Sequence, residues 1–120
     1  MARITDQAVA DALLAARELM NDGGNHWIKG KIRLPQLFKR KNGLQTETCY
    51  CSIGAIQAAT KGNRALRLRC YAALNKAIGR PGNAGYIGTI LSWNDNYERT
   101  WSEVSRAFRR AAKLAAKGQV

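Results

Sequence analysis

Two cysteines one residue apart, Cys49 and Cys51, are the side chains of this sequence best suited to nucleophilic chemistry. They stand at the predicted start of a helix, where the helix dipole and free backbone amides can lower the pKa of a thiol. His26 is the one histidine of the chain, so it would have to act as the general base, with Asp95 or Asn94 orienting its ring. One hypothesis is therefore a cysteine-dependent hydrolase or transferase that uses Cys51 with His26.

The same cysteine also has a structural explanation, which we favour. Small side chains recur along one side of the predicted helix and would let another helix pack closely against it; they belong to Cys51, Gly54, Ala55 and Ala58. His26 stands in a segment rich in Gly and Asn, where no neighbour in sequence would fix its ring. The sequence thus favours a protein that is not an enzyme, while the catalytic hypothesis stays open.

A metal site would have to combine the cysteines Cys49, Cys51 and Cys70 with His26. Zinc-binding cysteines are usually separated by about two to four residues, and the first two cysteines are separated by a single residue. Cys70 falls in the middle of an apolar stripe, which is typical of a buried thiol. We therefore predict neither a metal nor a cofactor.

Positive charge is the most unusual feature of the composition. Twenty Lys and Arg residues oppose eight Asp and Glu residues, which gives a formal net charge of +12 over 120 residues. A basic surface attracts polyanions by Coulomb attraction and counterion release, although it can also serve only to keep a protein soluble. We expect a partner that is either nucleic acid or an acidic host protein.

The remaining composition predicts a globular protein that works in a cytoplasm. The chain is 46% hydrophobic and 23% charged and contains two prolines. No apolar run approaches the roughly 18–20 residues that span a bilayer, and the N-terminus lacks the apolar region of a signal peptide. We expect one domain over residues 1–120 and no contact with a membrane.

Four helices can be predicted from apolar periodicity and from residues that cap helix ends. The first covers residues 6–20, with Thr5 as its N-cap. The second, over residues 50–60, is apolar on nearly all sides and should lie at the centre of the fold. The third follows the cap Asn63 and ends near residue 78, and the fourth follows Thr100, which heads a capping box.

The segments between these helices are harder to interpret. Residues 27–34 alternate like a strand that Pro35 would close, and Asn42-Gly43 is a strong signal for a two-residue turn. This segment forms either a small β-hairpin near residues 27–45 or an ordered basic loop. Residues 83–99 should form a loop or a short helix. The expected fold is mainly α, a single compact bundle of four to five helices to which the hairpin would be added.

The last predicted helix offers the best binding surface. One of its faces is apolar and should pack on the core, while the opposite face is basic. The residues that we expect to bind a partner are Arg106, Arg109, Arg110 and Lys113 on this face, and Lys39, Arg40 and Lys41 in a second patch. No side chain is identifiable as a reader of bases, so this surface should recognise charge. The predicted function is that of a small, basic, non-enzymatic binding protein.

The segment from Trp93 to Thr100 has two interpretations. Asn94 and Asp95 can cap a helical turn, and Arg99 can pair with Asp95 or Glu98 to fix the approach to the last helix. The alternative is a small-ligand pocket formed by Trp93, Asn94, Asp95 and Arg99, because it would combine a flat aromatic ring with polar and charged groups. We favour the structural interpretation and keep the pocket as an alternative.

Two motifs of the chain suggest a family. The pattern C-x-x-G-A at residues 51–55, followed by W-N-D-x-x-x-R-T at residues 93–100, resembles a small family of unknown function from actinobacteria and their phages. The likeness runs from about residue 8 to residue 116. It implies a small, mostly helical domain of phage or actinobacterial origin, and it supplies no established activity. On this basis we expect a phage or prophage protein that acts in the cytoplasm of its bacterial host.

Overall fold

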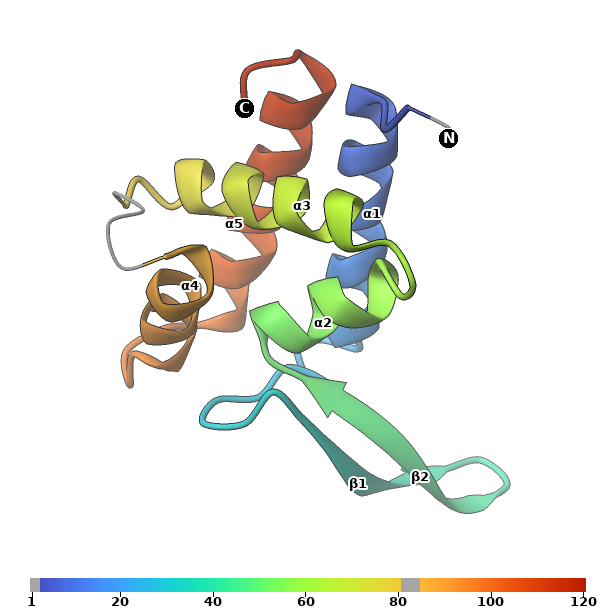
Figure 1. Ribbon diagram of the computed structural model, residues 1–120. Helices are drawn as coiled ribbons and strands as arrows, with labels where there is room; N and C mark the ends of the chain where they lie inside the picture. Colours follow the sequence, from blue (N-terminus) through green and yellow to red (C-terminus); the bar gives the residue numbers. More distant parts are fainter. Residues whose placement is uncertain (1–2, 81–84) are drawn as a thin grey trace.

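Five helices and one β-hairpin make up the computed structural model, which describes residues 3–80 and 85–120 (Figure 1). The helices are α1 (Asp6–Met20), α2 (Ser52–Ala59), α3 (Arg64–Ala77), α4 (Tyr86–Asp95) and α5 (Trp101–Ala116), and the strands are β1 (Arg33–Arg40) and β2 (Gly43–Tyr50). The predicted mainly α fold with four to five helices and a hairpin is confirmed. None of the described helices is long and apolar enough to cross a membrane.

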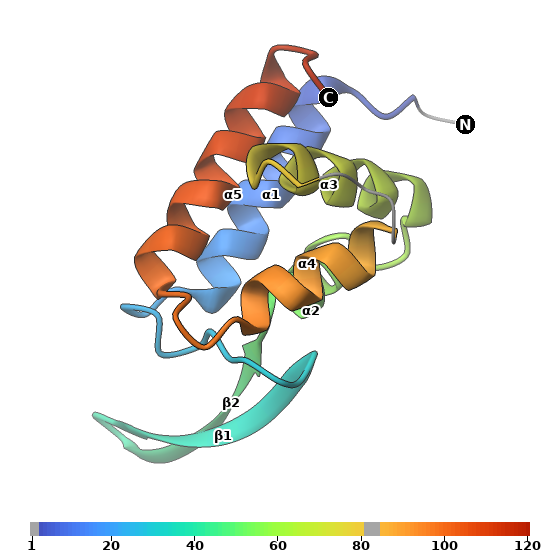
Figure 2. The same ribbon diagram turned by 90° about the vertical axis from the view of Figure 1, so that its left-hand side faces the viewer.

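Helices α1 and α5 lie side by side and run antiparallel (Figure 2). Their apolar faces are those that the sequence periodicity predicts, and Leu13 and Phe108 are fully buried between the helices of the core. Many of the other buried residues in this pair are alanines, which let the two backbones approach closely. One polar contact joins the pair, because Arg17 Nε donates to Ser105 Oγ at 2.8 Å.

The predicted helix caps are confirmed in the structure. Thr5 caps α1 by accepting from the Ala8 amide, and Asn63 caps α3 by accepting from the Leu66 amide at 3.0 Å. At the head of α5 the Thr100 side chain accepts from the backbone of Glu103, and the Glu103 carboxylate accepts from the Thr100 amide. Each cap satisfies amides that a helix leaves without an internal partner.

Helix α2 lies at the centre of the fold, as its uniformly apolar sequence predicts. Its first five residues, 52–56, are all buried. It begins at Ser52, two residues later than expected, because Tyr50 is the last residue of β2 and Cys51 is the N-cap. Helix α3 crosses the α1–α5 pair on one side (Figure 1), and Cys70 and Leu74 of its apolar stripe are fully buried.

At Gly54 of α2, the backbone of the loop that leads into β1 lies where a neighbouring helix is expected. A Cβ atom added at Gly54 would lie 2.0 Å from the backbone oxygen of Ile32, in the segment that enters β1. The same Ile32 oxygen accepts a hydrogen bond from the Cys51 amide at 3.0 Å. The expectation that a helix packs against this strip is therefore wrong at Gly54, where the base of the hairpin takes that place.

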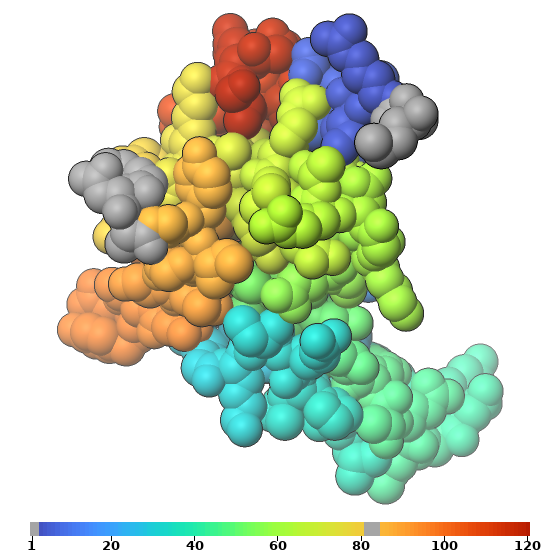
Figure 3. All heavy atoms as spheres, in the orientation of Figure 1, coloured from blue at the N-terminus to red at the C-terminus, as the bar shows by residue number. Residues whose placement is uncertain are grey.

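The hairpin lies further along the chain than predicted. Its strands pair antiparallel from Arg33 opposite Tyr50 to Arg40 opposite Gly43, so Lys41 and Asn42 form the turn. The turn is one residue earlier than the Asn-Gly signal suggests, and Gly43 begins β2 with a φ of +108°. The hairpin projects from the helical body as an arm (Figure 3).

Pro35 lies inside β1 instead of closing a strand. The backbone N–H of Tyr50 donates to the His26 carbonyl oxygen, and the Tyr50 carbonyl oxygen accepts from the Ile28 amide, so both groups point away from β1. Arg33 and Tyr50 are therefore opposite each other without hydrogen bonds between their backbones. Because pairs alternate along an antiparallel ladder, the next such pair is that of Pro35 and Thr48. The nitrogen of Pro35 therefore points to the free edge of β1, where a proline breaks no hydrogen bond.

Residues 86–95 of the uncertain segment form a short helix, α4, which is one of its two predicted forms. Residues 83 and 84, with which that prediction began, lie outside the described residues. Helix α4 packs against α3 and α2 and buries Ile90, Trp93 and Asn94. Its C-terminal end thereby brings the residues of the predicted pocket next to the start of α5.

Substitution of Gly54 by alanine should destabilise the protein by about 2–3 kcal/mol, because the new methyl group would collide with the Ile32 backbone. Gly88→Ala is the matched control, since Gly88 also lies in a helix and a Cβ atom there would meet nothing within 4 Å. We expect this control to gain about 0.5–1 kcal/mol from helix propensity. Urea denaturation of both variants measures the two effects, and equal stability of both variants would contradict the close approach at Gly54.

Candidate functional site

The basic face of α5 is open to solvent. Its predicted binding residues, Arg106, Arg109, Arg110 and Lys113, are all exposed. Among the described residues, none of these four side chains forms an ion pair with an acid. Residues 106 and 113 lie seven positions apart, so the charges extend over about 10 Å of the helix axis. The face therefore presents a row of cations whose charge is not neutralised within the fold.

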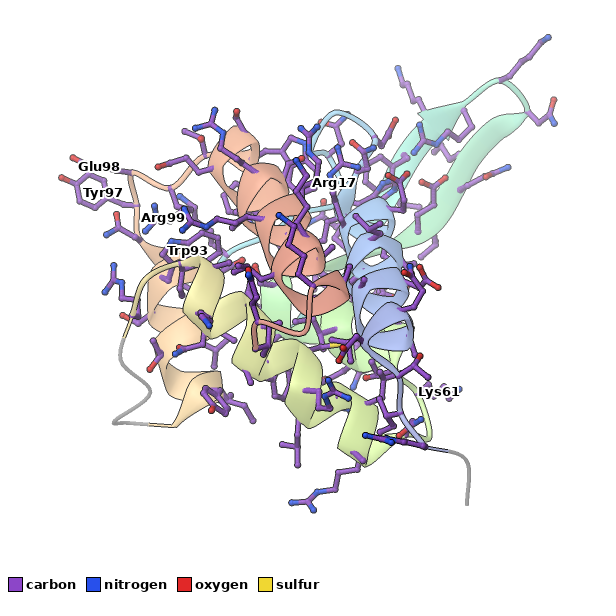
Figure 4. All side chains as sticks on the ribbon, turned by 90° about the horizontal axis from the view of Figure 1, so that it is seen from above. Arg17, Lys61, Trp93, Tyr97, Glu98 and Arg99 are labelled. Atoms are coloured by element: carbon purple, nitrogen blue, oxygen red, sulfur yellow. The ribbon has the colours of Figure 1, made fainter. Side chains whose placement is uncertain are left out.

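A shallow groove of about 210 Å³ opens beside the first half of α5. It is lined by Ala77, Ile78, Trp93, Arg99, Glu103, Arg106, Ala107 and Arg110. Two predicted sites meet here, because Trp93 and Arg99 belong to the predicted pocket while Arg106 and Arg110 belong to the basic face. Figure 4 shows Trp93 and Arg99 next to each other near the start of α5. We call this surface the α5 groove.

Arg99 forms one wall of the α5 groove and is held on three sides. Its guanidinium lies 4.6 Å from the ring centroid of Trp93, and its Nε donates to the Trp93 carbonyl oxygen at 2.9 Å. Its Nη1 donates to Glu103 Oε2 at 3.2 Å, one helical turn along the chain. The predicted pairing with Asp95 or Glu98 is wrong, because Glu103 takes that role and fixes the orientation of the arginine.

Glu103 is the single acidic residue among the described residues that line the α5 groove. Hydrogen bonds from the backbone and side chain of Thr100, together with the nearby charge of Arg99, hold its pKa below the usual range. Its negative charge is thus committed to the capping box and to Arg99. The groove keeps Arg106 and Arg110 as cations available to a ligand.

Asn94 faces the interior instead of completing a pocket with Trp93 and Arg99, while the exposed Asp95 bonds to the neighbouring loop. Asn94 is fully buried, and its Oδ1 accepts from Trp27 Nε1 at 2.8 Å and from the Ser52 amide and hydroxyl at 3.0 and 2.7 Å. Its Nδ2 donates to the Ile28 carbonyl and to Asp95 Oδ1.

Asp95 extends this network to the loop before the hairpin. Its Oδ1 also accepts the Gly30 amide at 3.0 Å, where the backbone adopts a positive φ. These contacts hold residues 28–32 in a loop and prevent the strand that their alternation predicts. The two polar side chains of the motif therefore have a structural role, but they join distant segments and do not cap a helical turn as predicted, since the C-cap of α4 is Asn96.

The second predicted patch, Lys39, Arg40 and Lys41, is divided by the fold. Lys39 and Lys41 are exposed near the tip of the hairpin. Arg40 instead donates to Glu47 through Nε at 2.8 Å and to Asp22 through Nη2 at 3.1 Å. Its side-chain hydrogen bonds with these two carboxylates raise the pKa of Arg40 above its usual value. Arg40 fastens the hairpin to the end of α1, and its charge is compensated there.

The structure does not bring Cys51 and His26 together as a nucleophile and its base. One ring nitrogen of His26 contacts Glu47 Oε1 at 2.7 Å and the other contacts the Asn21 carbonyl oxygen at 3.2 Å. The Cys51 thiol is fully buried and accepts the Gly54 amide as the N-cap of α2. Burial raises the pKa of Cys51, which is the opposite of what a reactive thiolate requires.

The remaining cysteines are also buried thiols. Cys70 lies in the core, and burial raises its pKa to about 12. Among residues 3–80 and 85–120, no three His, Cys, Asp or Glu side chains are grouped so that they could hold a metal ion. Four groove residues were not predicted as site residues, namely Ala77, Ile78, Glu103 and Ala107. The first two come beside the arginines only through the packing of α3 against α5.

Asn94→Asp should destabilise the protein by about 3 kcal/mol or more, because it places a carboxylate oxygen against the Ile28 carbonyl and the Asp95 carboxylate. Asn96→Asp is the control, since Asn96 is exposed and uses only its acceptor oxygen, toward the Glu98 amide at 2.9 Å. Thermal and urea denaturation compare the two variants. A loss of similar size in both would argue against Asn94 as the centre of a buried network.

The contact between Arg40 and Glu47 should make stability depend on acid pH. Hydrogen bonds from Arg40 and His26 lower the pKa of Glu47 from 4.5 to about 2. The unfolded chain thus binds a proton more readily, so the stabilisation is complete above pH 4.5 and is lost as pH falls through about 2. Urea unfolding should find Glu47→Gln less stable than wild type at neutral pH, with the difference closing in acid. Glu98→Gln controls for the loss of one exposed carboxylate outside this cluster, and an unchanged difference in acid would contradict the assignment.

Comparison with known proteins agrees with the motifs of the sequence. No curated protein and no solved structure is significantly similar to this chain. One family model matches residues 4–114, close to the extent of the resemblance carried by the two motifs. The chain therefore belongs to the family of unknown function DUF6197.

Proposed function

We propose that this protein binds nucleic acid through the basic face of α5 and the adjoining α5 groove. The observation that carries the proposal is the row of exposed cations on one helix, none of which has an acidic partner among the described residues. Uncompensated positive charges on one face repel one another and destabilise the free protein. A polyanion relieves that repulsion and releases its own counterions.

The spacing of the charges suits a phosphate backbone. Arg106, Arg110, Lys113 and Lys117 recur every three or four residues, so they share one side of the helix over about 16 Å. Duplex DNA carries about one negative charge per 1.7 Å of its axis, and several phosphates would therefore lie within reach of this row. Arg99 and Trp93 limit the groove at one end of the row and would fix how a strand enters it.

The interaction should depend on charge more than on base sequence. No described side chain on this face has the support that a bidentate base contact needs, whereas long flexible cations contact phosphates readily. The protein is therefore proposed as a non-enzymatic nucleic-acid-binding protein. Its origin in a phage or prophage, and an action on the bacterial host, remain predictions. An acidic host protein is the alternative partner for the same face.

Replacing Arg106 and Arg110 together by glutamine should weaken binding to all sequences alike. Fluorescence anisotropy with labelled duplex DNA, single-stranded DNA and RNA, at several salt concentrations, provides the measurement. The slope of log affinity against log salt should fall in magnitude by about 2 for duplex DNA, because two phosphate contacts are lost. Both residues are exposed, so the fold should keep its stability.

The matched control is the double variant Arg3→Gln with Arg64→Gln. Arg3 and Arg64 are exposed and lie outside the α5 groove, and their replacement removes the same net charge. Equal weakening in both double variants would mean that net charge alone drives binding and would contradict an interface at α5. Absence of salt-dependent binding in the wild type would reject nucleic acid and leave the acidic protein partner for this face.

A further inference from the structure

A second basic cleft lies between the base of the hairpin and helices α2 and α3. It has a volume of about 500 Å³ and is lined by Arg33, Tyr50, Gln57, Ala58, Lys61 and Arg67. In Figure 4, Lys61 lies on the opposite side of the molecule from Trp93 and Arg99. This α2–α3 cleft is therefore separate from the α5 groove.

Three cations converge on the α2–α3 cleft from different parts of the chain. Arg33 begins β1, Lys61 lies in the turn after α2, and Arg67 lies in the first half of α3. No acid is among the residues that line the cleft, and none of the three cations forms an ion pair within the described part of the chain. The fold thus gathers positive charge at this place without compensating it.

The guanidinium of Arg67 is held in position by a buried side chain. Its Nε donates to Thr60 Oγ1 at 3.3 Å, and the Thr60 hydroxyl in turn donates to the Ile56 carbonyl at 2.6 Å. Thr60 is only 2% exposed, so this contact is part of the packed interior. Anchoring through Nε leaves the two terminal nitrogens of Arg67 for a second, bidentate partner.

A buried hydroxyl beside the cleft lacks a partner. Tyr71 is 2% exposed, and among the described residues no group forms a hydrogen bond with its hydroxyl oxygen. Burial raises the pKa of Tyr71, while the nearby Gln57 side chain and the charge of Arg67 oppose that rise. Gln57 and Arg67 both line the cleft, whereas the buried Tyr71 lies behind this lining and does not itself face the cleft.

We propose that the α2–α3 cleft binds a small phosphorylated molecule, with Arg33, Lys61 and Arg67 on its phosphate oxygens. A guanidinium fork matches a phosphate group, and the lysine adds a point charge. The cleft volume falls within the range of small-molecule sites, roughly 300–1,000 Å³. Tyr50 and Gln57 would contact the part of the ligand that carries no phosphate. This site does not depend on nucleic-acid binding at α5.

Isothermal titration calorimetry with inorganic pyrophosphate and with adenosine diphosphate tests the proposal. Both probes should bind at one site per chain, and the nucleotide should bind more tightly if an aromatic ring and an amide contribute. Tighter or equal binding of pyrophosphate would still support a phosphate site and would identify the phosphates as the whole recognition element. Lack of binding by both probes would overturn the proposal.

Variants of the cationic residues locate the binding site. Arg67→Met should weaken both probes about tenfold or more, because a charge-assisted hydrogen bond is lost. Lys61→Gln gives an independent test, since Lys61 is exposed and no described contact of the fold depends on it. Arg64→Gln, on the first turn of α3 but outside the cleft, is the matched control and should bind like wild type.

The outcomes separate this site from the one at α5. Loss of probe binding in Arg67→Met and Lys61→Gln, with retention in Arg64→Gln and in the Arg106 and Arg110 double variant, would support the cleft. Equal loss in Arg64→Gln, or loss only in the α5 variant, would overturn it. A failure of nucleic acid to bind at α5 would leave these titrations unaffected, so the two proposals fail independently.

Discussion

The side-chain amide of Asn94 is the interaction on which the remaining structure depends. It sits at the end of α4 and joins the loop at Trp27 and Ile28 to the head of α2 at Ser52, three segments that are far apart in sequence. A buried amide is stable only when its donors and acceptor are all paired, so the network permits one arrangement of these segments. That arrangement sets where the hairpin leaves the helical body and places Trp93, the neighbour of Asn94, in the wall of the α5 groove.

The few acids of this basic protein are used to brace its fold. Five of them pair with arginines, in the contacts Glu18–Arg17, Glu47–Arg40, Asp22–Arg40, Asp6–Arg69 and Glu103–Arg99. Surface pairs of this kind add little stability one by one, but they decide which arginines have fixed positions. Of the cations that remain, one row lies along α5 and three line the α2–α3 cleft, while others, such as Lys39 and Lys41 on the hairpin, are exposed elsewhere. Some cations therefore hold elements of the fold together, whereas the others face solvent.

Much of the helical part could be predicted from sequence because its signals are local. Thr5, Asn63 and Thr100 cap the helices that follow them, and apolar periodicity identifies the buried faces. The hairpin was misplaced because its limits depend on distant residues, among them Asp95, which holds Gly30 in a loop. The basic face of α5 was predictable for the same local reason as the helix. The groove beside it was not, because Ala77 meets the α5 arginines only through tertiary packing.

The projecting hairpin has two strands and therefore edges that could pair with strands of another molecule. Unpaired edges of this kind are where folded proteins begin to aggregate. Pro35 offers no N–H along the free edge of β1, and Lys39 and Lys41 are exposed near its end. Two copies of the chain approaching edge to edge would meet a gap in the ladder and like charges. Edge-to-edge pairing of two copies along β1 is therefore disfavoured by the shape and charge of the strand itself.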